Sequence, residues 1–292
     1  MCSRLAARLP ADYPAGMSDA PIETMRPAPG EPVIPMINWG GLQALYIKEV
    51  RRFFKVHLQT IWAPAITTLL YLVIFTVALG RGGRTVMGTS FADFIAPGLI
   101  VSTGMMQSAF ANASFSLLVG KIQGTIVDYL MPPLSAAELL AGLVGASMTR
   151  AILVGCAIWA AMWLWPGITH VPKHLWAVLW FGLNGAALLS FIGVLASVWA
   201  EKFDHNAAVT NFIIQPLSLL SGTFYSVDNL HGAFRTISHL NPIFHVISGF
   251  RYGFLGVADS NVVVGALVLL AINSALGVLC YVLILRGWKL RS

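Results

Sequence analysis

The sequence contains few charged residues. Only 10% of its 292 residues are Asp, Glu, Lys or Arg, whereas 57% are hydrophobic and the mean hydropathy is +0.75. A soluble domain carries roughly a quarter charged residues, so this chain has more apolar surface than one core can bury. The composition excludes an ordinary soluble domain and predicts an integral membrane protein.

Acidic residues are missing from the centres of the apolar runs, and sequence motifs of catalysis are missing as well. Proton-driven transporters usually carry a carboxylate inside the membrane, so its absence disfavours a secondary transporter or channel. No Walker A sequence occurs, because Gly120-Lys121 lacks the upstream glycine and the following Ser or Thr. No cluster of nucleophile, carboxylates or histidines indicates a polytopic membrane enzyme acting on lipid. We therefore expect no catalytic residue, no metal site and no cofactor in this chain.

Cysteine is scarce, and the positive charge is not arranged for binding nucleic acid. Cys2, Cys156 and Cys280 form no CxxC pair, so no disulfide framework or zinc site follows. The net charge of +6 arises from Lys and Arg that flank the apolar runs, where they set topology and contact lipid head groups. We expect membrane lipids as partners and no nucleic acid.

The chain divides into three parts. Residues 1–35 hold seven prolines and no sustained apolar run, which predicts a disordered tail. Residues 36–57 place apolar residues at helical spacing with Lys and Arg mostly away from them, which is typical of an amphipathic helix at a membrane surface. Residues 58–292 contain six runs near the roughly 20 apolar residues that a span needs: Leu58–Leu79, Phe94–Val119, Gly142–Leu164, Leu175–Trp199, Val209–Phe224 and Val262–Leu285.

The distribution of Lys and Arg predicts the orientation. A basic cluster precedes the first span and a basic tail follows the last one, so we expect both termini in the cytoplasm of a bacterial inner-membrane protein. The apolar stretch Ile243–Val257 is too short to span, contains Arg251 and follows Asn241-Pro242. We interpret it as a re-entrant or interfacial piece on the outer side, within the segment of residues 225–259.

The loop between the second and third predicted spans, residues 120–138, carries the most distinctive pattern. Pro132-Pro133 ends a short helix, and Ser135 to Glu138 has the form of a capping box that begins the next one. Four apolar residues of the loop share one helical face: Ile122, Ile126, Val127 and Leu130. The pattern predicts a short helix across the cytoplasmic face, either an ordinary connector or a docking element for a soluble partner.

Together these features resemble the permease subunit of an ABC-2 type exporter, of the drug type or of the polysaccharide or nodulation-factor type. The resemblance extends from about Trp39 to Arg291. Its matching pieces are Lys48-Glu49-Val50-Arg51-Arg52-Phe53, Phe94-Ile95-Ala96-Pro97-Gly98, the loop Gln123-Gly124-Thr125-Ile126-Val127-Asp128-Tyr129-Leu130-Met131-Pro132-Pro133, and Leu240-Asn241-Pro242.

The resemblance implies an all-α integral membrane fold with six transmembrane helices. An amphipathic interfacial helix would precede them, a cytoplasmic coupling helix would join spans 2 and 3, and re-entrant outer helices would join spans 5 and 6. It also implies export by a homodimer with two copies of a separate ABC ATPase, which would bind ATP and Mg²⁺ in place of this chain. The residues expected to contact the ATPase are Ile122, Gln123, Gly124, Thr125, Asp128, Tyr129, Pro132, Pro133 and Glu138.

Two further groups of residues are candidates for the substrate path. Polar residues at helical spacing either line a path or hold helices together; they are Gln107, Ser108, Asn112 and Ser116 in span two, and Asn211, Gln215 and Ser218 in span five. Arg150 in span three either extends to the inner interface or faces a wet cavity or the loop carboxylates. The expected outer gate consists of Phe224, Tyr225, Asn241, Pro242, His245, Arg251 and Tyr252, with His245 and Arg251 near the outer head groups.

Overall fold

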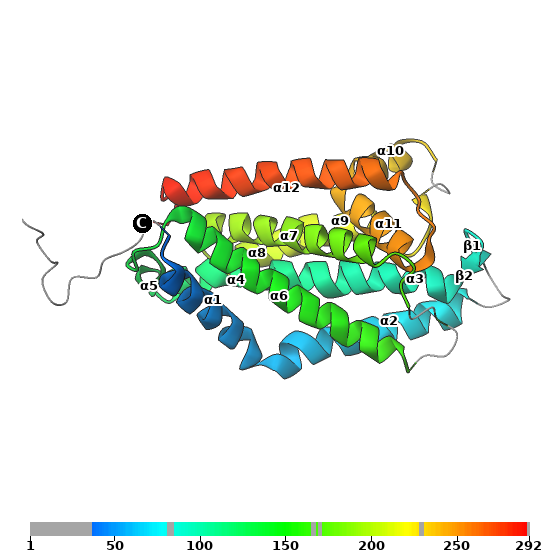
Figure 1. Cartoon of the computed structure of the whole chain (residues 1–292), viewed down its shortest axis with the longest axis horizontal. Coiled ribbons are helices and arrows are strands. Elements are labelled where there is room, and N and C mark those ends of the chain that lie inside the picture. Colours follow the sequence, from blue (N-terminus) through cyan, green and yellow to red (C-terminus); the bar gives the residue numbers. More distant parts are fainter. Residues whose placement is uncertain (1–36, 81–84, 165–167, 169–170, 228–230, 291–292) are drawn as a thin grey trace, which may run out of the picture. The chain divides into compact units, whose positions relative to one another are not determined.

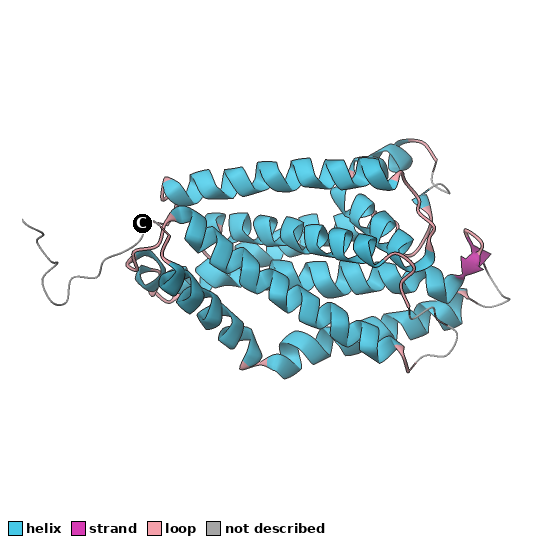
Figure 2. Cartoon of the chain, viewed as in Figure 1, coloured by secondary structure: helices cyan, strands magenta, loops and turns pink. Residues whose placement is uncertain are grey.

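The computed structural model describes residues 37–80, 85–164, 168, 171–227 and 231–290. The predicted tail, residues 1–35, therefore lies outside the described residues. From Asn38 onward the chain forms one compact unit, and helices make up most of its described part (Figure 2).

The helices follow one another along the chain as labelled in Figure 1. Before the third predicted span the elements are α1 (Trp39–Phe54), η1 (Leu58–Trp62), α2 (Ala63–Leu79), β1 (Thr85–Val86), β2 (Thr89–Ser90), α3 (Phe91–Leu99), η2 (Ile100–Met106), α4 (Gln107–Ile122) and α5 (Val127–Leu130). The remaining elements are α6 (Ala136–Met162), α7 (Leu175–Trp199), α8 (Phe203–Val209), η3 (Thr210–Ile214), α9 (Gln215–Leu219), α10 (Ala233–Leu240), α11 (Pro242–Leu255) and α12 (Val262–Leu285).

Five helices in the described part are long and apolar enough to cross a membrane. They are Leu58–Ala78, Phe91–Ile122, Ala136–Met162, Leu175–Trp199 and Val262–Leu285. The all-α membrane fold is thus confirmed, and two of the predicted spans coincide with their helices at both ends.

The predicted fifth span is the run α8–η3–α9, whose parts have 7, 5 and 5 residues. At 1.5 Å per residue such a run reaches roughly 25 Å, somewhat less than a hydrocarbon core of about 30 Å. The run begins with α8 in contact with α7 and ends with α9 in contact with α11 (Figure 1). The run thus extends along the bundle. Because it is short for a span, the count of six spans remains a prediction.

The core is centred on the second and fourth spanning helices. The apolar part of Phe91–Ile122 is 83% buried, whereas the corresponding parts of the first and last spans are only 17% buried. A Cβ at Gly193 of α7 would lie 2.8 Å from the Ala113 Cβ of α4, so this close contact requires glycine. The apolar outer faces of α2 and α12 are therefore available to lipid or to another protein.

Three π-helical segments interrupt the helices, each close to a proline. Pro64 follows η1, Pro97 precedes η2 and Pro216 follows η3. Proline removes a helical N–H donor, and single-turn π segments frequently occur at functional sites. Residues in or directly after all three segments line one cavity.

Candidate functional site

Helix α1 carries a carboxylate into the protein interior. Leu45, Glu49 and Phe53 are spaced by four residues and form its buried stripe, and Glu49 is fully buried. Its Oε2 atom lies 2.9 Å from Arg52 Nη2 and accepts a 2.8 Å hydrogen bond from Ser116 Oγ. An ion and a hydroxyl thus compensate a charge that would otherwise be costly to bury.

Tyr129 of the loop binds the other oxygen of Glu49. Its Oη donates a 2.8 Å hydrogen bond to Glu49 Oε1, and Lys48 Nζ lies 3.7 Å from the centre of its ring. Burial, and then the charge of Glu49, raise the pKa of Tyr129, so its hydroxyl stays protonated and remains a donor. The loop is therefore attached to α1 through a buried hydrogen bond.

Arg52 connects this pair to the second span. Its Nη2 donates to the Asn112 carbonyl oxygen at 2.9 Å and to Ser116 Oγ at 2.9 Å. Asn112 Nδ2 donates in turn to Ser147 Oγ of α6 at 3.1 Å. Asn112 and Ser116, two predicted path residues, here hold helices together. We call Glu49, Arg52, Asn112, Ser116 and Tyr129 the Glu49 network.

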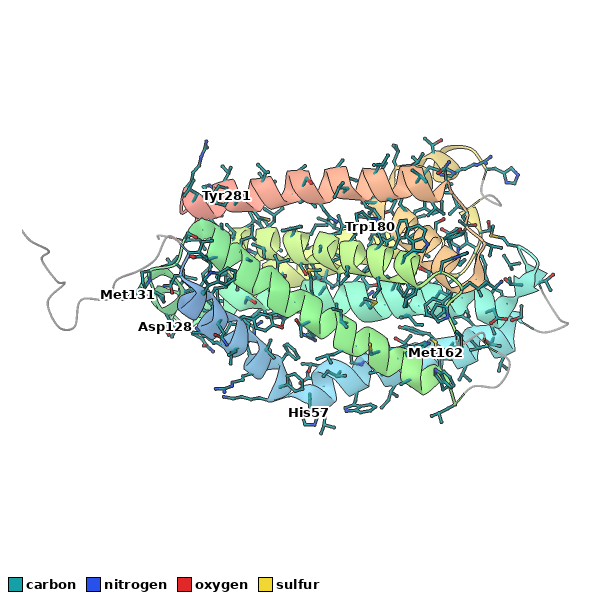
Figure 3. The ribbon with its side chains drawn as sticks, in the orientation of Figure 1. His57, Asp128, Met131, Met162, Trp180 and Tyr281 are labelled. Carbon is teal, nitrogen blue, oxygen red and sulfur yellow. The ribbon has the colours of Figure 1, made fainter. Side chains whose placement is uncertain are left out.

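The loop itself is less helical than its apolar pattern predicts. Gly124 adopts a φ of +71°, which ends α4 and leaves α5 with only four residues. Tyr129 points inward, while its neighbours are exposed. The exposed members are Ile122, Gln123, Gly124, Thr125, Val127, Asp128, Leu130, Met131, Pro132 and Pro133. Figure 3 labels Asp128 and Met131 at this end of the bundle, far from Met162 at the opposite end of α6.

The predicted capping box begins α6 and is confirmed. Glu138 accepts hydrogen bonds from the backbone N–H of Ser135 at 2.7 Å and of Asn38 at 2.5 Å. Its side chain therefore joins the start of α6 to the start of α1. Glu138 is buried, unlike most residues of the loop.

A cavity of about 590 Å³ lies between α2, α4, α6 and α9. Its volume is within the range of small-molecule sites. The lining includes the predicted path residues Gln107, Ser108, Gln215 and Ser218, the predicted gate residue Phe224, and Arg150. Asn211 is exposed and is not part of the lining.

The first span contributes one continuous stripe to this cavity. Gln59, Ala63, Thr67, Tyr71 and Phe75 all line it at four-residue intervals, so the cavity follows this helix for roughly 24 Å. The stripe changes from an amide and a hydroxyl to two aromatic rings, which suits a molecule that is polar at one end only.

The π segments also converge on the cavity. Gln59 belongs to η1, Ser102 and Thr103 belong to η2, and Gln215 directly follows η3. A π segment displaces the residues after it around the helix axis and leaves weaker backbone hydrogen bonds. The walls of the cavity therefore contain the irregular parts of three helices.

Where the structure describes it, the outer segment contains the two short helices α10 and α11, as predicted. Arg251 of α11 is fully buried. Its Nε donates to the Phe94 carbonyl at 3.1 Å and its Nη2 donates to the Gly222 carbonyl at 2.8 Å. Its Nη1 pairs with the Asp259 carboxylate. Three separate parts of the chain bind this guanidinium, at Phe94, Gly222 and Asp259. The side chain is thus enclosed by protein, and its predicted position near the outer head groups stays a prediction.

The other expected gate residues lie at the same end of the bundle. Asn241 caps α11 by accepting from the Ile243 N–H at 3.0 Å, while Pro242 occupies the first helical position. The partners of the remaining four are the His239 carbonyl oxygen for His245, the His174 ring for Tyr252, the Leu219 carbonyl oxygen for Tyr225, and the Phe75 ring for Phe224. The Phe75–Phe224 centroids are 4.4 Å apart, so this contact joins the residue directly before the outer segment to the first span.

Sequence reasoning missed the buried position of Glu49 and its partners. The signal is present, because Glu49 lies exactly midway between Leu45 and Phe53 on the four-residue stripe of α1. An acidic residue at such a position, three residues before Arg52, indicates a buried ion pair rather than a solvated face.

The fold and the site define a polytopic helical membrane protein with a lateral cavity and a structured loop at one end of the bundle. The sequence profile of the ABC-2 type transporter family matches residues 41–255. The chain is 37% identical over 259 residues to the inner membrane transport permease YadH of Escherichia coli K12, covering 88% of this chain and 99% of YadH.

More distant relatives are nodulation proteins of rhizobia. Nodulation protein J of Rhizobium leguminosarum bv. viciae is 29% identical over 229 residues, which cover 76% of this chain and 86% of that protein. Nodulation protein J of Rhizobium meliloti is 24% identical over 223 residues, which cover 76% and 84% respectively. This chain belongs to the ABC-2 type transporter family and is a multi-pass membrane transport permease.

Proposed function

We propose that this chain is the transmembrane subunit of an ATP-driven exporter and works with a separate ABC ATPase. The proposal rests on the way in which the loop is attached. Tyr129 is hydrogen-bonded to the buried Glu49, while Asp128 and the apolar residues around it are exposed and free to contact a partner. A surface connector needs no buried attachment to a second helix, whereas a docking element that transmits force does.

In this proposal the loop receives the motion of the ATPase and the Glu49 network passes it on. Two copies of the ATPase would bind ATP and Mg²⁺, since this sequence has no Walker A motif. A shift of Tyr129 would displace Glu49 and Arg52, and Arg52 contacts α4 at Asn112 and Ser116. The second span also lines the cavity through Gln107 and Ser108.

The cavity is the proposed substrate path, and the outer segment is its proposed gate. Exposed apolar residues flank the cavity on two elements, Ile66, Leu70 and Ile74 of α2 and Phe212 and Ile213 of η3. A second copy of the chain packed against these residues would complete the path between two protomers. This arrangement supports the proposed homodimer.

Affinity purification of the tagged chain from its own host tests the assembly. We expect an ABC ATPase to co-purify, and native mass spectrometry to give two copies of each subunit. A chain that purifies without any ATPase, and transports amphiphiles regardless of ATP, would instead be a secondary transporter or channel.

The proposed orientation has both termini and the loop in the cytoplasm of a bacterial inner membrane. In a background without Cys2, Cys156 and Cys280, single cysteines at the exposed positions Thr125 and Val171 should react with an impermeant maleimide from opposite sides. Labelling of Val171→Cys from outside in intact spheroplasts, with Thr125→Cys labelled only after lysis, is the expected result.

A further inference from the structure

We infer that the cavity binds the anionic head group of an amphiphilic substrate at Arg150. The inference rests on the proposed function of the cavity as the substrate path and adds the chemical class of the molecule that passes through it.

The lining of the cavity has positive charge and no negative charge. Of its 18 lining residues one is charged, Arg150, and none is Asp or Glu. The remaining polar groups are neutral amides and hydroxyls, among them Gln107, Gln215 and Ser218. A cation bound here would be repelled by Arg150, whereas an anion would find hydrogen-bond donors on α4, α6 and α9.

Arg150 lacks a counter-ion within the described part of the chain. Its Nε atom is buried without a hydrogen-bond partner, and none of the ion pairs formed by described residues includes it. The charge that acts on it is the guanidinium of Arg52, which is also positive and is itself paired with Glu49. The nearby carboxylate of Glu49 therefore already has a counter-ion.

The depth of Arg150 makes this lack of a partner costly. It lies 14 positions after Ala136, the first residue of the 27-residue helix α6, which places it roughly 21 Å along that helix and near its middle. An unpaired charge at such depth is expensive, and such residues typically serve function. An incoming phosphate, sulfate or carboxylate would supply the missing acceptor in the bidentate geometry that guanidinium favours.

The other part of the cavity suits an apolar tail. Tyr71, Phe75 and Phe224 line it, and the rings of Phe75 and Phe224 are in contact at 4.4 Å. The combination of one cation and neutral donors with these three aromatic rings matches a molecule with an anionic head and an apolar body. A neutral drug or an unmodified glycan would leave Arg150 unpaired.

Photolabelling of the full chain in nanodiscs of zwitterionic lipid tests the inference. The probes are three dodecyl compounds with the same diazirine, carrying a phosphate, a hydroxyl or a trimethylammonium group. We expect the phosphate to label cavity residues of α2, α4 and α9 about tenfold more efficiently than the other two, as a charge-assisted hydrogen bond implies. Arg150→Gln should abolish that preference while the alcohol still labels, and Arg150→Lys should retain most of it.

The exposed Arg51 provides a matched control, since Arg51→Gln removes one positive charge away from the cavity and should leave the preference unchanged. Equal labelling by all three probes in the wild type, or an intact phosphate preference in Arg150→Gln, would overturn the inference. Neither result would contradict the proposal that the cavity is the substrate path. Absence of label from every cavity residue would overturn both. Addition of phosphatidylglycerol separates the two sources of anion: suppressed labelling identifies a resident lipid head group, and unchanged labelling identifies a transported amphiphile.

Discussion

The hydroxyl of Tyr129 lies 2.8 Å from a carboxylate oxygen of Glu49, and this contact attaches the loop to the helix before the first span. Glu49 is fully buried and its second oxygen binds Arg52 and Ser116. The loop, α1 and the second span therefore share one buried carboxylate. A displacement of any of the three alters the hydrogen bonds of the other two.

Tyr129→Phe removes the hydroxyl and preserves the ring. We expect a loss of about 1.5–3 kcal/mol of stability, the range for a hydrogen bond to a charged group, and a lower ratio of transport to ATP hydrolysis. Thermal unfolding of the purified complex and parallel flux and hydrolysis assays measure both. Tyr46→Phe is the matched control, because it removes a 2.7 Å hydrogen bond to Thr149 between α1 and α6 without involving the loop. An unchanged coupling ratio in Tyr129→Phe would remove the Glu49 network from the proposed mechanism.

Asp128→Lys reverses an exposed charge beside the anchored tyrosine. Exposed charges contribute less than about 1 kcal/mol to stability, so the permease should remain folded while the ATPase binds less tightly. Co-purification yield and the elution profile of the permease alone distinguish these effects. Asp204→Lys is the control, since Asp204 is also exposed and lies in the first turn of α8. Equal ATPase recovery in both variants would contradict docking at the loop.

A reversible crosslink between α2 and the expected gate residue Phe224 tests the gate. Phe75 and Phe224 have their rings in contact, so cysteines at these two positions should react with a short bifunctional thiosulfonate. We expect the crosslink to stop ATP-dependent flux and dithiothreitol to restore it, because gating segments must move to open a path. Each single cysteine treated in the same way should retain flux. Full flux with the crosslink formed would show that this contact is static.

Breaking the buried pair of Arg251 and Asp259 should destabilise the protein strongly. Both side chains are fully buried, and removal of one partner of such a pair typically costs about 3–5 kcal/mol. Arg251→Met and Asp259→Ala should each lower the melting temperature and the yield in membranes, whereas the exposed Arg286→Ala should not. A stable Arg251→Met variant that binds anionic amphiphiles poorly would instead give Arg251 a role in substrate binding.

The sequence predicts the long helices well where both ends carry a signal. Helix α12 begins after Asn261, whose side chain accepts from the N–H groups of Val263 and Val264, and α6 begins at the Ser135 capping box. The loop is harder to predict, because its apolar spacing favours a continuous helix while Gly124 at a φ of +71° interrupts it. The π segments depend on helix packing near the prolines and have no simple sequence pattern.

Part of the candidate site could also be predicted from spacing alone. Gln107, Ser108, Gln215 and Ser218 do meet in one cavity, because helical periodicity identifies the residues that share a face. Spacing does not determine what each face contacts, so Asn112 and Ser116 turn toward Arg52 instead. The buried pairing of Arg251 could not be predicted for the same reason, since its partner Asp259 lies beyond the end of its helix.

Reconstitution of the chain with its co-purifying ATPase in proteoliposomes tests the central claim most directly. Flux of the dodecyl phosphate should require ATP, both subunits and an intact catalytic site in the ATPase, and it should stop when that site is inactivated by mutation. Flux by this chain alone, or flux that a proton gradient drives in the absence of ATP, would contradict the account.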